Sequence, residues 1–346
     1  MKPHVSTRFF ALLLLIIPLV AGAKTRDGIS KTMKKQFAIQ RDATLLLNNK
    51  FGDITCINWD KNEVLIEVTI TVETKSEEKA QKVFNNIEIR FQGDPNRVEA
   101  RTEFTKEFNS KGPFNVDYKV WMPAWVSIDL TNNFGDVFIE DLNGKGTFRV
   151  AYGNANLENL NHGDNLVDVK FGSATIGTAK GAVITIQYSR LTLDYAGSLK
   201  IDSKFSDMQA GKVVVLDGAF EGGHIYLGQV SVMTVKTKFS NFNVEVLEEK
   251  LNLDCQYGNI EVDHVSAGFK SITVGNKFGS VELDLPPDAA YNLDAESKFG
   301  GIKFPESNAK FTYREISDQK QVFRGTVGNN PAATVTIRTE FGNITL

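Results

Sequence analysis

The sequence predicts an all-β fold: a right-handed, single-stranded β-helix (a β-solenoid) with coils of about 17–21 residues. A motif that recurs with a period near twenty residues is typical of a solenoid, whose repeats bury their apolar faces only against their neighbours. Short runs such as residues 281–285 alternate apolar and polar side chains, the period-two pattern of a strand with one buried face. Proline is absent between Pro123 and Pro286, as expected for strands that are paired on both sides.

The recurring motif is an aromatic residue, then a glycine or serine, then a residue common in turns. The aromatic–glycine copies are Phe51-Gly52, Phe134-Gly135, Tyr152-Gly153, Phe171-Gly172, Tyr257-Gly258, Phe278-Gly279, Phe299-Gly300 and Phe341-Gly342. Serine takes the second place after Tyr188, Phe205 and Phe239, and Phe220-Glu221-Gly222 is interpreted as a degenerate copy. Successive aromatic residues from Phe134 to Phe299 lie 15–21 residues apart.

We interpret this motif as a structural corner. The aromatic ring is expected to end a strand and to stack in the core on the equivalent rings of neighbouring coils. The small residue is expected to allow a tight turn with a positive φ, and the third residue to satisfy backbone groups. Residues used in this way are poor candidates for binding, so function is expected between the corners or at the irregular ends.

The first 23 residues read as an export signal. Lys2 and Arg8 accompany an apolar run from Phe9 to Val20, and Ala21-Gly22-Ala23 fits a cleavage site. The run is too short to span a bilayer as a stable helix. We therefore expect an exported protein with no transmembrane segment after removal of the signal.

Residues 24–130 are expected to form an N-terminal β-rich cap with one short helix near 75–87. The run Val64–Val72 alternates like a strand, and Thr74 with Glu77 matches a capping box at the start of the helix. Further strands are expected near 87–91, 97–104 and 116–121. Such a cap would cover one open edge of the solenoid.

Residues 131–346 are expected to form the β-solenoid, with an insertion near 303–333. Pro305, Pro331 and the polar run Asp318–Gln321 interrupt the strand pattern there. This interruption indicates a hairpin or loop before a last strand, Val335–Leu346.

Composition excludes some classes of partner. Apolar residues make up 42% and charged residues 23%, as in globular proteins. With a pI near 5.9 the chain has no long-range attraction to nucleic acid or anionic lipid, so no nucleic-acid partner is expected. Cys56 and Cys255 both lie in alternating strands and are interpreted as small core residues, although an exported protein could also join them in a disulfide.

No motif for catalysis, for a metal or for a cofactor is found. His162, His224 and His264 are isolated and lack the spacing of a metal site. An enzymatic alternative is still open, because β-helices also serve polysaccharide lyases and hydrolases, which need two or three carboxylates close together in a groove. Asp194 and Asp202 form one pair that neighbouring coils could bring together.

Two tryptophans are the candidates for an exposed contact patch. Trp121 and Trp125 flank Pro123, and an indole ring offers a flat apolar face with one polar edge. A place in the core is the alternative for both rings.

Several segments occur together in a fixed order: the signal peptide, Leu47–Ile54, the strand Val64–Val72 with its following helix, Val120–Pro123, and Asn132–Val137. This combination resembles the putative-adhesin family of exported bacterial β-helix proteins, a family of unknown function typical of Bacteroidota. The resemblance covers nearly the whole mature chain and implies a β-helix with a surface role but no defined ligand.

The sequence thus favours a non-enzymatic exported β-solenoid, an adhesin or binding scaffold in the periplasm or on the surface of a Gram-negative bacterium. Its expected partner is a protein or glycan of the cell envelope, with no cofactor. The alternative is a carbohydrate-active β-helix enzyme of the polysaccharide lyase or hydrolase type.

Overall fold

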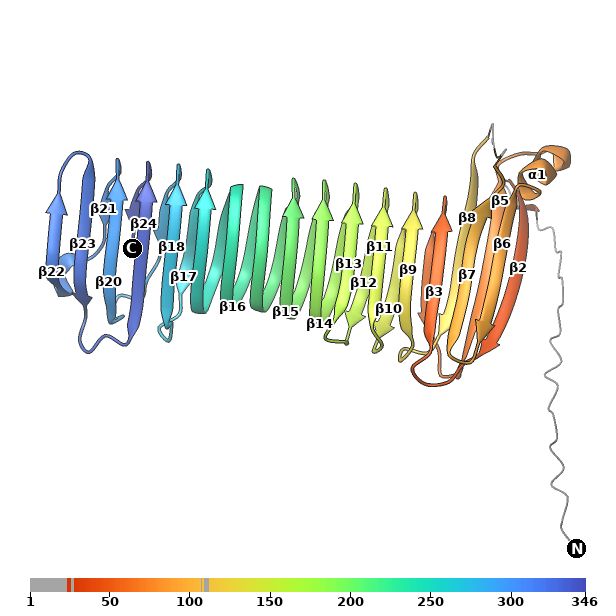
Figure 1. Cartoon of the computed structure of the whole chain (residues 1–346), viewed down its shortest axis with the longest axis horizontal. Coiled ribbons are helices and arrows are strands. Elements are labelled where there is room, and N and C mark those ends of the chain that lie inside the picture. The colour runs from red at the N-terminus through yellow and green to blue at the C-terminus, as the bar shows by residue number, and fades with distance from the viewer. Residues whose placement is uncertain (1–23, 26–27, 107, 109–111) are drawn as a thin grey trace, which may run out of the picture.

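The computed structural model describes residues 24–25, 28–106, 108 and 112–346. These residues form a long rod of short strands, with the N-terminal region at one end and a C-terminal hairpin at the other (Figure 1). The all-β, solenoid-like architecture expected from the sequence is confirmed, and α1 is the sole α-helix of the described residues. The export signal expected over residues 1–23 lies outside the described residues.

Antiparallel strands and one helix close the N-terminal end of the rod. The elements are β1 (Lys24–Thr25), β2 (Gly28–Ala38), β3 (Thr44–Lys50), β4 (Ile54–Asn58), β5 (Glu63–Val72), α1 (Glu77–Phe84), β6 (Ile87–Asp94), β7 (Arg97–Phe104) and β8 (Phe114–Met122). β2, β5 and β8 pair antiparallel, and β8 joins β4 in parallel. On the opposite side β6 pairs antiparallel with β7, which joins β3 in parallel.

The helix α1 begins at Glu77 because Ser76 is its N-cap, with the Ser76 hydroxyl accepting a hydrogen bond from the Lys79 backbone N–H at 3.4 Å. The capping box predicted for Thr74 is therefore wrong. The Thr74 hydroxyl instead accepts from the Ser76 backbone N–H at 3.2 Å. The helix buries Ala80 and lies beside β2, β5 and β6 at the end of the rod.

The coils build two opposite faces. Their strands are β9 (Ser127–Asn133), β10 (Val137–Leu142), β11 (Gly146–Ala151), β12 (Asn154–Leu160), β13 (Asn165–Lys170), β14 (Ser173–Gln187), β15 (Arg190–Lys204), β16 (Asp207–Gln256), β17 (Ile260–Val265), β18 (Ser271–Lys277) and β19 (Val281–Leu283). β10, β12 and the first halves of β14 and β15 pair in parallel on what we call face A. β9, β11, β13 and the second halves of β14 and β15 do so on face B.

The pairing register reproduces the period of the sequence. Ala155 pairs with Ala174, and Ala174 pairs with Leu191, so each residue lies beside its equivalent one coil away. The backbone hydrogen bonds of each coil are therefore made to neighbouring coils, as in any parallel ladder. Equivalent side chains consequently form columns along the rod.

At the C-terminal end the order of coils in space differs from their order in sequence. The elements are β20 (Tyr291–Lys298), β21 (Ile302–Lys303), the 3₁₀ turn η1 (Glu306–Asn308), β22 (Ala309–Ile316), β23 (Lys320–Val327), β24 (Ala333–Glu340) and β25 (Ile344–Thr345). β24 lies between β18 and β20 and is parallel to both. The β22–β23 hairpin then pairs antiparallel against β20 and covers its edge (Figure 1).

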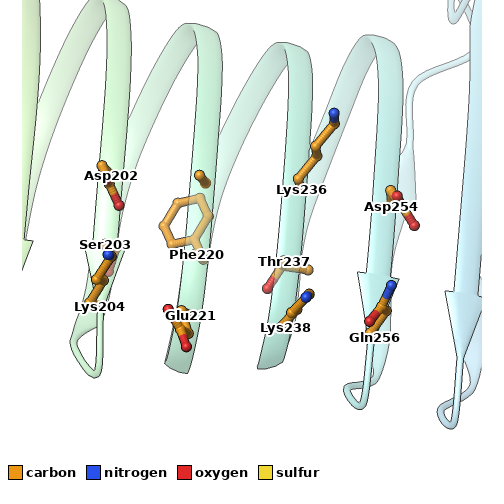
Figure 2. Close-up of a pocket in the computed structure, with 11 residues that line it drawn as sticks. Asp202, Ser203, Lys204, Phe220, Glu221, Lys236, Thr237, Lys238, Asp254 and Gln256 are labelled. Carbon is orange, nitrogen blue, oxygen red and sulfur yellow. The ribbon is translucent and has the colours of Figure 1, made fainter.

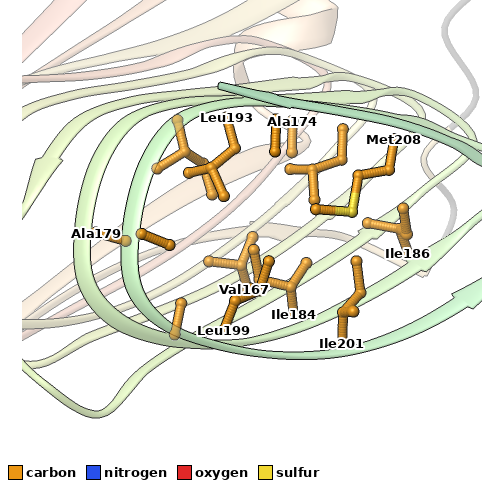
Figure 3. Packing of buried hydrophobic residues seen from close by; sticks show 14 of the residues in the cluster. Val167, Ala174, Ala179, Ile184, Ile186, Leu193, Leu199, Ile201 and Met208 are labelled. Atoms are coloured by element: carbon orange, nitrogen blue, oxygen red, sulfur yellow. The ribbon is translucent and has the colours of Figure 1, made fainter. Parts of the chain in front are cut away.

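The core is a thin layer between the two faces (Figure 3). Leu193 and Met208 point inward from face A and meet Ile184 and Ile201 from face B. Because Ile184 pairs with Ile201 one coil away, each inward side chain also packs on its equivalent along the rod. Burial of these apolar columns is the main force holding the coils together.

Candidate functional site

One long edge of the rod carries the aromatic residues of the repeat. The parallel strands β3, β9, β11, β13, β18, β20 and β24 all end at the residue immediately before a motif aromatic, and they point toward the same edge (Figure 1). In-register pairing then sets these aromatic residues in one column. We call this column the aromatic ladder and each ring in it a rung.

Each aromatic residue, and not the glycine after it, has the left-handed backbone conformation. Its φ lies between 49° and 64° in Phe51, Phe134, Tyr152, Phe171, Tyr188, Phe205, Phe239, Tyr257, Phe278, Phe299 and Phe341. The expectation that the small residue supplies the positive φ is therefore wrong for these corners, although Gly52 also has a positive φ, of 157°. At Gly135 the glycine serves close packing between coils, because a Cβ there would lie 2.0 Å from the carbonyl oxygen of Gly52 one coil away.

The rungs stack face to face. Neighbouring ring centroids lie 4.7–5.3 Å apart with interplanar angles of 1–14°. These are favourable offset-stacking separations. The spatial order is Phe51, Phe134, Tyr152, Phe171, Tyr188, Phe205, then after a gap Phe239, Tyr257, Phe278, Phe341 and Phe299.

The rungs lie outside the core, which corrects the expectation of a core stack. Apart from Phe51, which packs against Phe104 and Phe114, each ring is between 45% and 60% exposed. The reason is the left-handed turn, because it reverses the direction of a side chain that strand alternation would have placed inside. Except at Phe205, Phe239 and Phe299, which stack on one rung each, both faces of these exposed rings are covered by neighbouring rungs, and the ring edges point to solvent.

A buried polar column, which sequence reasoning missed, supports the corners from inside. It lies two residues before the rungs, where Asn132 donates to the carbonyl oxygens of Gly52 and Asp136, at 3.0 and 3.3 Å. Thr339 donates in the same way to the Gly342 carbonyl oxygen at 2.9 Å. These bonds supply side-chain donors to carbonyl groups of the turns.

Lysines line one side of the ladder. The residue immediately before a rung is lysine at Lys50, Lys170, Lys204, Lys238, Lys277 and Lys298. The ammonium group of Lys50 lies 4.9 Å from the centre of the Phe51 ring and 5.9 Å from that of Phe134. Both distances are within the range of a cation–π interaction.

On the other side of the ladder, turn residues bond from coil to coil. The Asp53 carboxylate accepts from the Asp136 backbone N–H at 2.7 Å, and the Asp136 carboxylate accepts from that of Asn154 at 2.8 Å. Asn241 accepts equivalently from Asn259 at 2.9 Å. The side chain at the third motif position thus accepts a hydrogen bond from the backbone of the neighbouring coil.

The ladder has one internal gap. The register pairs Lys204 with Glu221, so the residue that takes the place of a rung after Phe205 is Gly222, with φ +72°. The interpretation of Phe220 as the degenerate rung is wrong by two residues. Phe220 instead points inward, is 3% exposed and packs edge-on against Phe242 at 5.2 Å.

The coils match a known family. A family model described as Toastrack DUF4097 fits residues 124–346, more than half of the chain. The chain belongs to the Toastrack DUF4097 family. This confirms the resemblance to a putative-adhesin family of unknown function that the sequence indicated.

Solved structures of low sequence identity also match this chain. A putative adhesin from Parabacteroides distasonis is 11% identical, with a TM-score of 0.41, over 73% of this chain and 97% of its own. A putative adhesin from Parabacteroides merdae is 13% identical, with a TM-score of 0.38, over 73% and 96%. A putative lipid binding protein from Parabacteroides distasonis is 11% identical, with a TM-score of 0.37, over 74% and 96%. No curated protein matches the sequence.

Charged side chains line an open hollow of about 350 Å³ on face B, near the gap (Figure 2). Asp202, Lys236 and Asp254 form one row there. Lys204, Glu221 and Lys238 form a second row beside the ladder. Ala219, which pairs with Asp202 one coil away, carries only a methyl group and leaves room for the hollow. The carboxylates of Asp202 and Asp254 are three coils apart, roughly 14 Å at one strand spacing per coil.

Other residues singled out by the sequence lie apart from the ladder. Asp194 and Asp202 point outward from opposite faces of this Toastrack coil, so they do not form a carboxylate pair. Trp121 on β8 is partly buried, with the Lys119 ammonium 5.1 Å from its ring, and Trp125 packs partly buried against the core. Cys56 and Cys255 are both buried free thiols.

Within the described residues, no cluster of three or more histidine, cysteine or acidic side chains could hold a metal ion. No helix in the same part of the chain has the length and apolar character needed to cross a membrane.

Proposed function

We propose that the protein is a non-enzymatic binding scaffold of adhesin type, which acts in the periplasm or on the surface of a Gram-negative bacterium. The exposed aromatic ladder carries this proposal. Contiguous apolar surface of this extent is unusual on a soluble protein and typically marks an interaction site. The ladder is about 50 Å long at one strand spacing per coil, and it offers a partner protein or glycan a straight row of ring edges with lysines beside it.

The stacked rungs contribute little net stability to the fold. A left-handed conformation costs a non-glycine residue roughly 1–2 kcal/mol, whereas an aromatic pair contributes about 0.5–1.5 kcal/mol beyond its buried area. The strain therefore offsets much of the stacking, and glycine or asparagine would form the same corner without strain. Backbone strain that is repeated at one exposed edge supports a role in binding.

A glycan array and an envelope-protein overlay, both probed with residues 24–346, test the proposal. The test variant replaces two adjacent rungs, Phe171→Ser with Tyr188→Ser. The matched control replaces two exposed apolar residues away from the ladder, Tyr195→Ser with Val215→Ser, which are 40% and 41% exposed. We expect binding at least about tenfold weaker in the ladder variant, since two aromatic contacts are lost, and unchanged in the control. Equal binding by both variants would exclude the ladder as the binding edge.

The handedness of the rod and the roles of its two ends are also proposed. We infer a right-handed single-stranded β-helix, because parallel strands joined by a crossover within one sheet are right-handed in nearly all proteins. Residues 24–130 act as its cap and residues 303–333 as its insertion. A crystal structure of residues 24–346 decides the handedness, and a left-handed rod would contradict it.

A carbohydrate-active enzyme is the second candidate, and the hollow beside the gap is the observation that favours it. The hollow combines the carboxylates of Asp202, Glu221 and Asp254 with lysines of the same rows. The test is release of reducing ends or unsaturated products from a panel of acidic and neutral polysaccharides, with Glu221→Gln as control. Turnover that is lost in Glu221→Gln would favour the enzyme over the scaffold.

A further inference from the structure

We propose that the gap in the aromatic ladder at Gly222 is a binding slot for one aromatic side chain of a partner polypeptide, which inserts as the missing rung. This inference deepens the proposed function and rests on it. It identifies the internal place on the ladder where two rungs face each other across an empty position.

The width of the slot follows from the repeat. Phe205 and Phe239 stack on Tyr188 and Tyr257 at 5.3 and 5.0 Å, but one whole coil separates the two from each other. Two strand spacings place their rings about 10 Å apart. A single ring in the middle would then lie about 5 Å from each neighbour, within the favourable range for offset stacking.

The walls of the slot are the rings of Phe205 and Phe239, each of which stacks on another rung on one side only. Phe205 and Phe239 are 54% and 60% exposed, and Phe239 is the most exposed of the described rungs. Phe205 borders the empty position directly, because a Cβ built on Gly222 would lie 3.1 Å from its Cδ1 atom. Other internal rungs of the ladder are stacked on both faces, so an inserted ring gains two face contacts only here.

The neighbouring charges favour an aromatic ring over a sugar. Lys204 and Lys238 precede the two walls and occupy the place from which Lys50 reaches two successive rings, at 4.9 and 5.9 Å. From there both ammonium groups can approach an inserted π-system, which a saturated pyranose lacks. Glu221 lies between these lysines and offers an acceptor for a tyrosine hydroxyl or an indole N–H (Figure 2).

The coil that carries the gap is adapted to it. Its aromatic residue has moved to the inside, where Phe220 is flanked in its column by the small residues Ser203 and Thr237. The rod therefore keeps a ring in this coil while the outer position stays empty. Gly222 also keeps a positive φ of 72°, close to the range of the neighbouring rungs, so the empty position has the geometry of a rung without the ring.

The test uses p-cresol, the tyrosine side-chain analogue, with ligand-observed saturation-transfer NMR on residues 24–346. We expect ring-proton transfer with the wild-type chain and at least about tenfold weaker affinity in Gly222→Phe, whose own ring fills the slot. Phe239→Leu, which keeps the apolar bulk but removes one flat wall, should also weaken binding. Tyr195→Phe, a conservative change at an exposed residue of face A away from the ladder, should leave it unchanged and serves as the matched control.

A peptide-level experiment identifies the source of the ring. Random twelve-residue peptides displayed on phage are selected on the wild-type chain and counter-selected on Gly222→Phe. We expect the survivors to share one tryptophan, tyrosine or phenylalanine.

Two results would overturn the slot. In the first, p-cresol binds Gly222→Phe and Phe239→Leu as tightly as wild type. In the second, methyl β-glucopyranoside gives saturation transfer where p-cresol gives none. Either result leaves the proposed function standing if the Phe171/Tyr188 double variant still loses its partner, so the two failures are distinguishable.

Discussion

Replacing Phe171 by alanine and by glycine separates the two opposing energies of a rung. Phe171 stacks on Tyr152 at 4.9 Å and on Tyr188 at 5.3 Å, and its φ is 56°. Both substitutions remove the two stacks, which costs about 1–3 kcal/mol, together with the area of a ring that is 47% exposed. Alanine keeps roughly 1–2 kcal/mol of left-handed strain, whereas glycine relieves it and instead costs about 0.4–1 kcal/mol through the freer unfolded chain.

The glycine variant should therefore be more stable than the alanine variant by about 0.5–1 kcal/mol. Equilibrium unfolding in urea, followed by circular dichroism, measures this difference if both variants keep the wild-type m-value. The matched control is Val183, an outward strand residue with an ordinary φ and 42% exposure. There the order should reverse, with alanine more stable than glycine by about 0.5–1 kcal/mol. The same order at both positions would refute the strain argument.

Three further predictions concern the corners and the titratable groups. Gly135→Ala should destabilise the chain by several kcal/mol, because its Cβ would lie 2.0 Å from a carbonyl oxygen; a melting temperature within 2 °C of wild type would contradict this. Desolvation raises the pKa of Asp294, but hydrogen bonds from two arginines outweigh it and hold the pKa below its ordinary value. Asp294→Asn should thus lower the free energy of unfolding by at most about 1 kcal/mol at neutral pH. The difference between variant and wild type should disappear as the pH falls through the folded-state pKa of Asp294, which lies below about 3.9. A constant difference down to pH 2 would argue against the pairing of Asp294 with the two arginines. Burial, with a smaller contribution from Asp254, raises the pKa of the Cys255 thiol to about 12, and burial raises that of Cys56 also. Neither thiol should react with a thiolate-specific reagent at pH 8 until urea is added.

The columns of the rod could be predicted from the sequence, but the direction of the rungs could not. Alternation places Ile186 inside and the next residue outside, and by the same rule it would place the Tyr188 ring inside. The left-handed φ of Tyr188 breaks the rule. Aromatic residues carry no local signal for that conformation, which asparagine, aspartate and glycine usually adopt.

The position of the gap could have been predicted from the sequence. Phe205 and Phe239 are 34 residues apart, which is two coils of 17 and places the missing rung at residue 222. The aromatic residue at position 220 suggested that the rung lies there. The pairing of Lys204 with Glu221 excludes Phe220 as the rung. The spatial order of the last coils could not be predicted from the sequence. Phe341 lies between Phe278 and Phe299 because a strand distant in sequence is inserted there, and no local sequence pattern encodes such an insertion.

Site-specific photo-crosslinking in the living bacterium tests the binding role of the ladder most directly. A photoreactive phenylalanine analogue is placed at Tyr188, a rung, and separately at Tyr195, an exposed residue on face A. The ladder account predicts a defined crosslinked product from position 188 and none from position 195. Products from position 195 alone, or from neither position in cells that bind their partner, would contradict it.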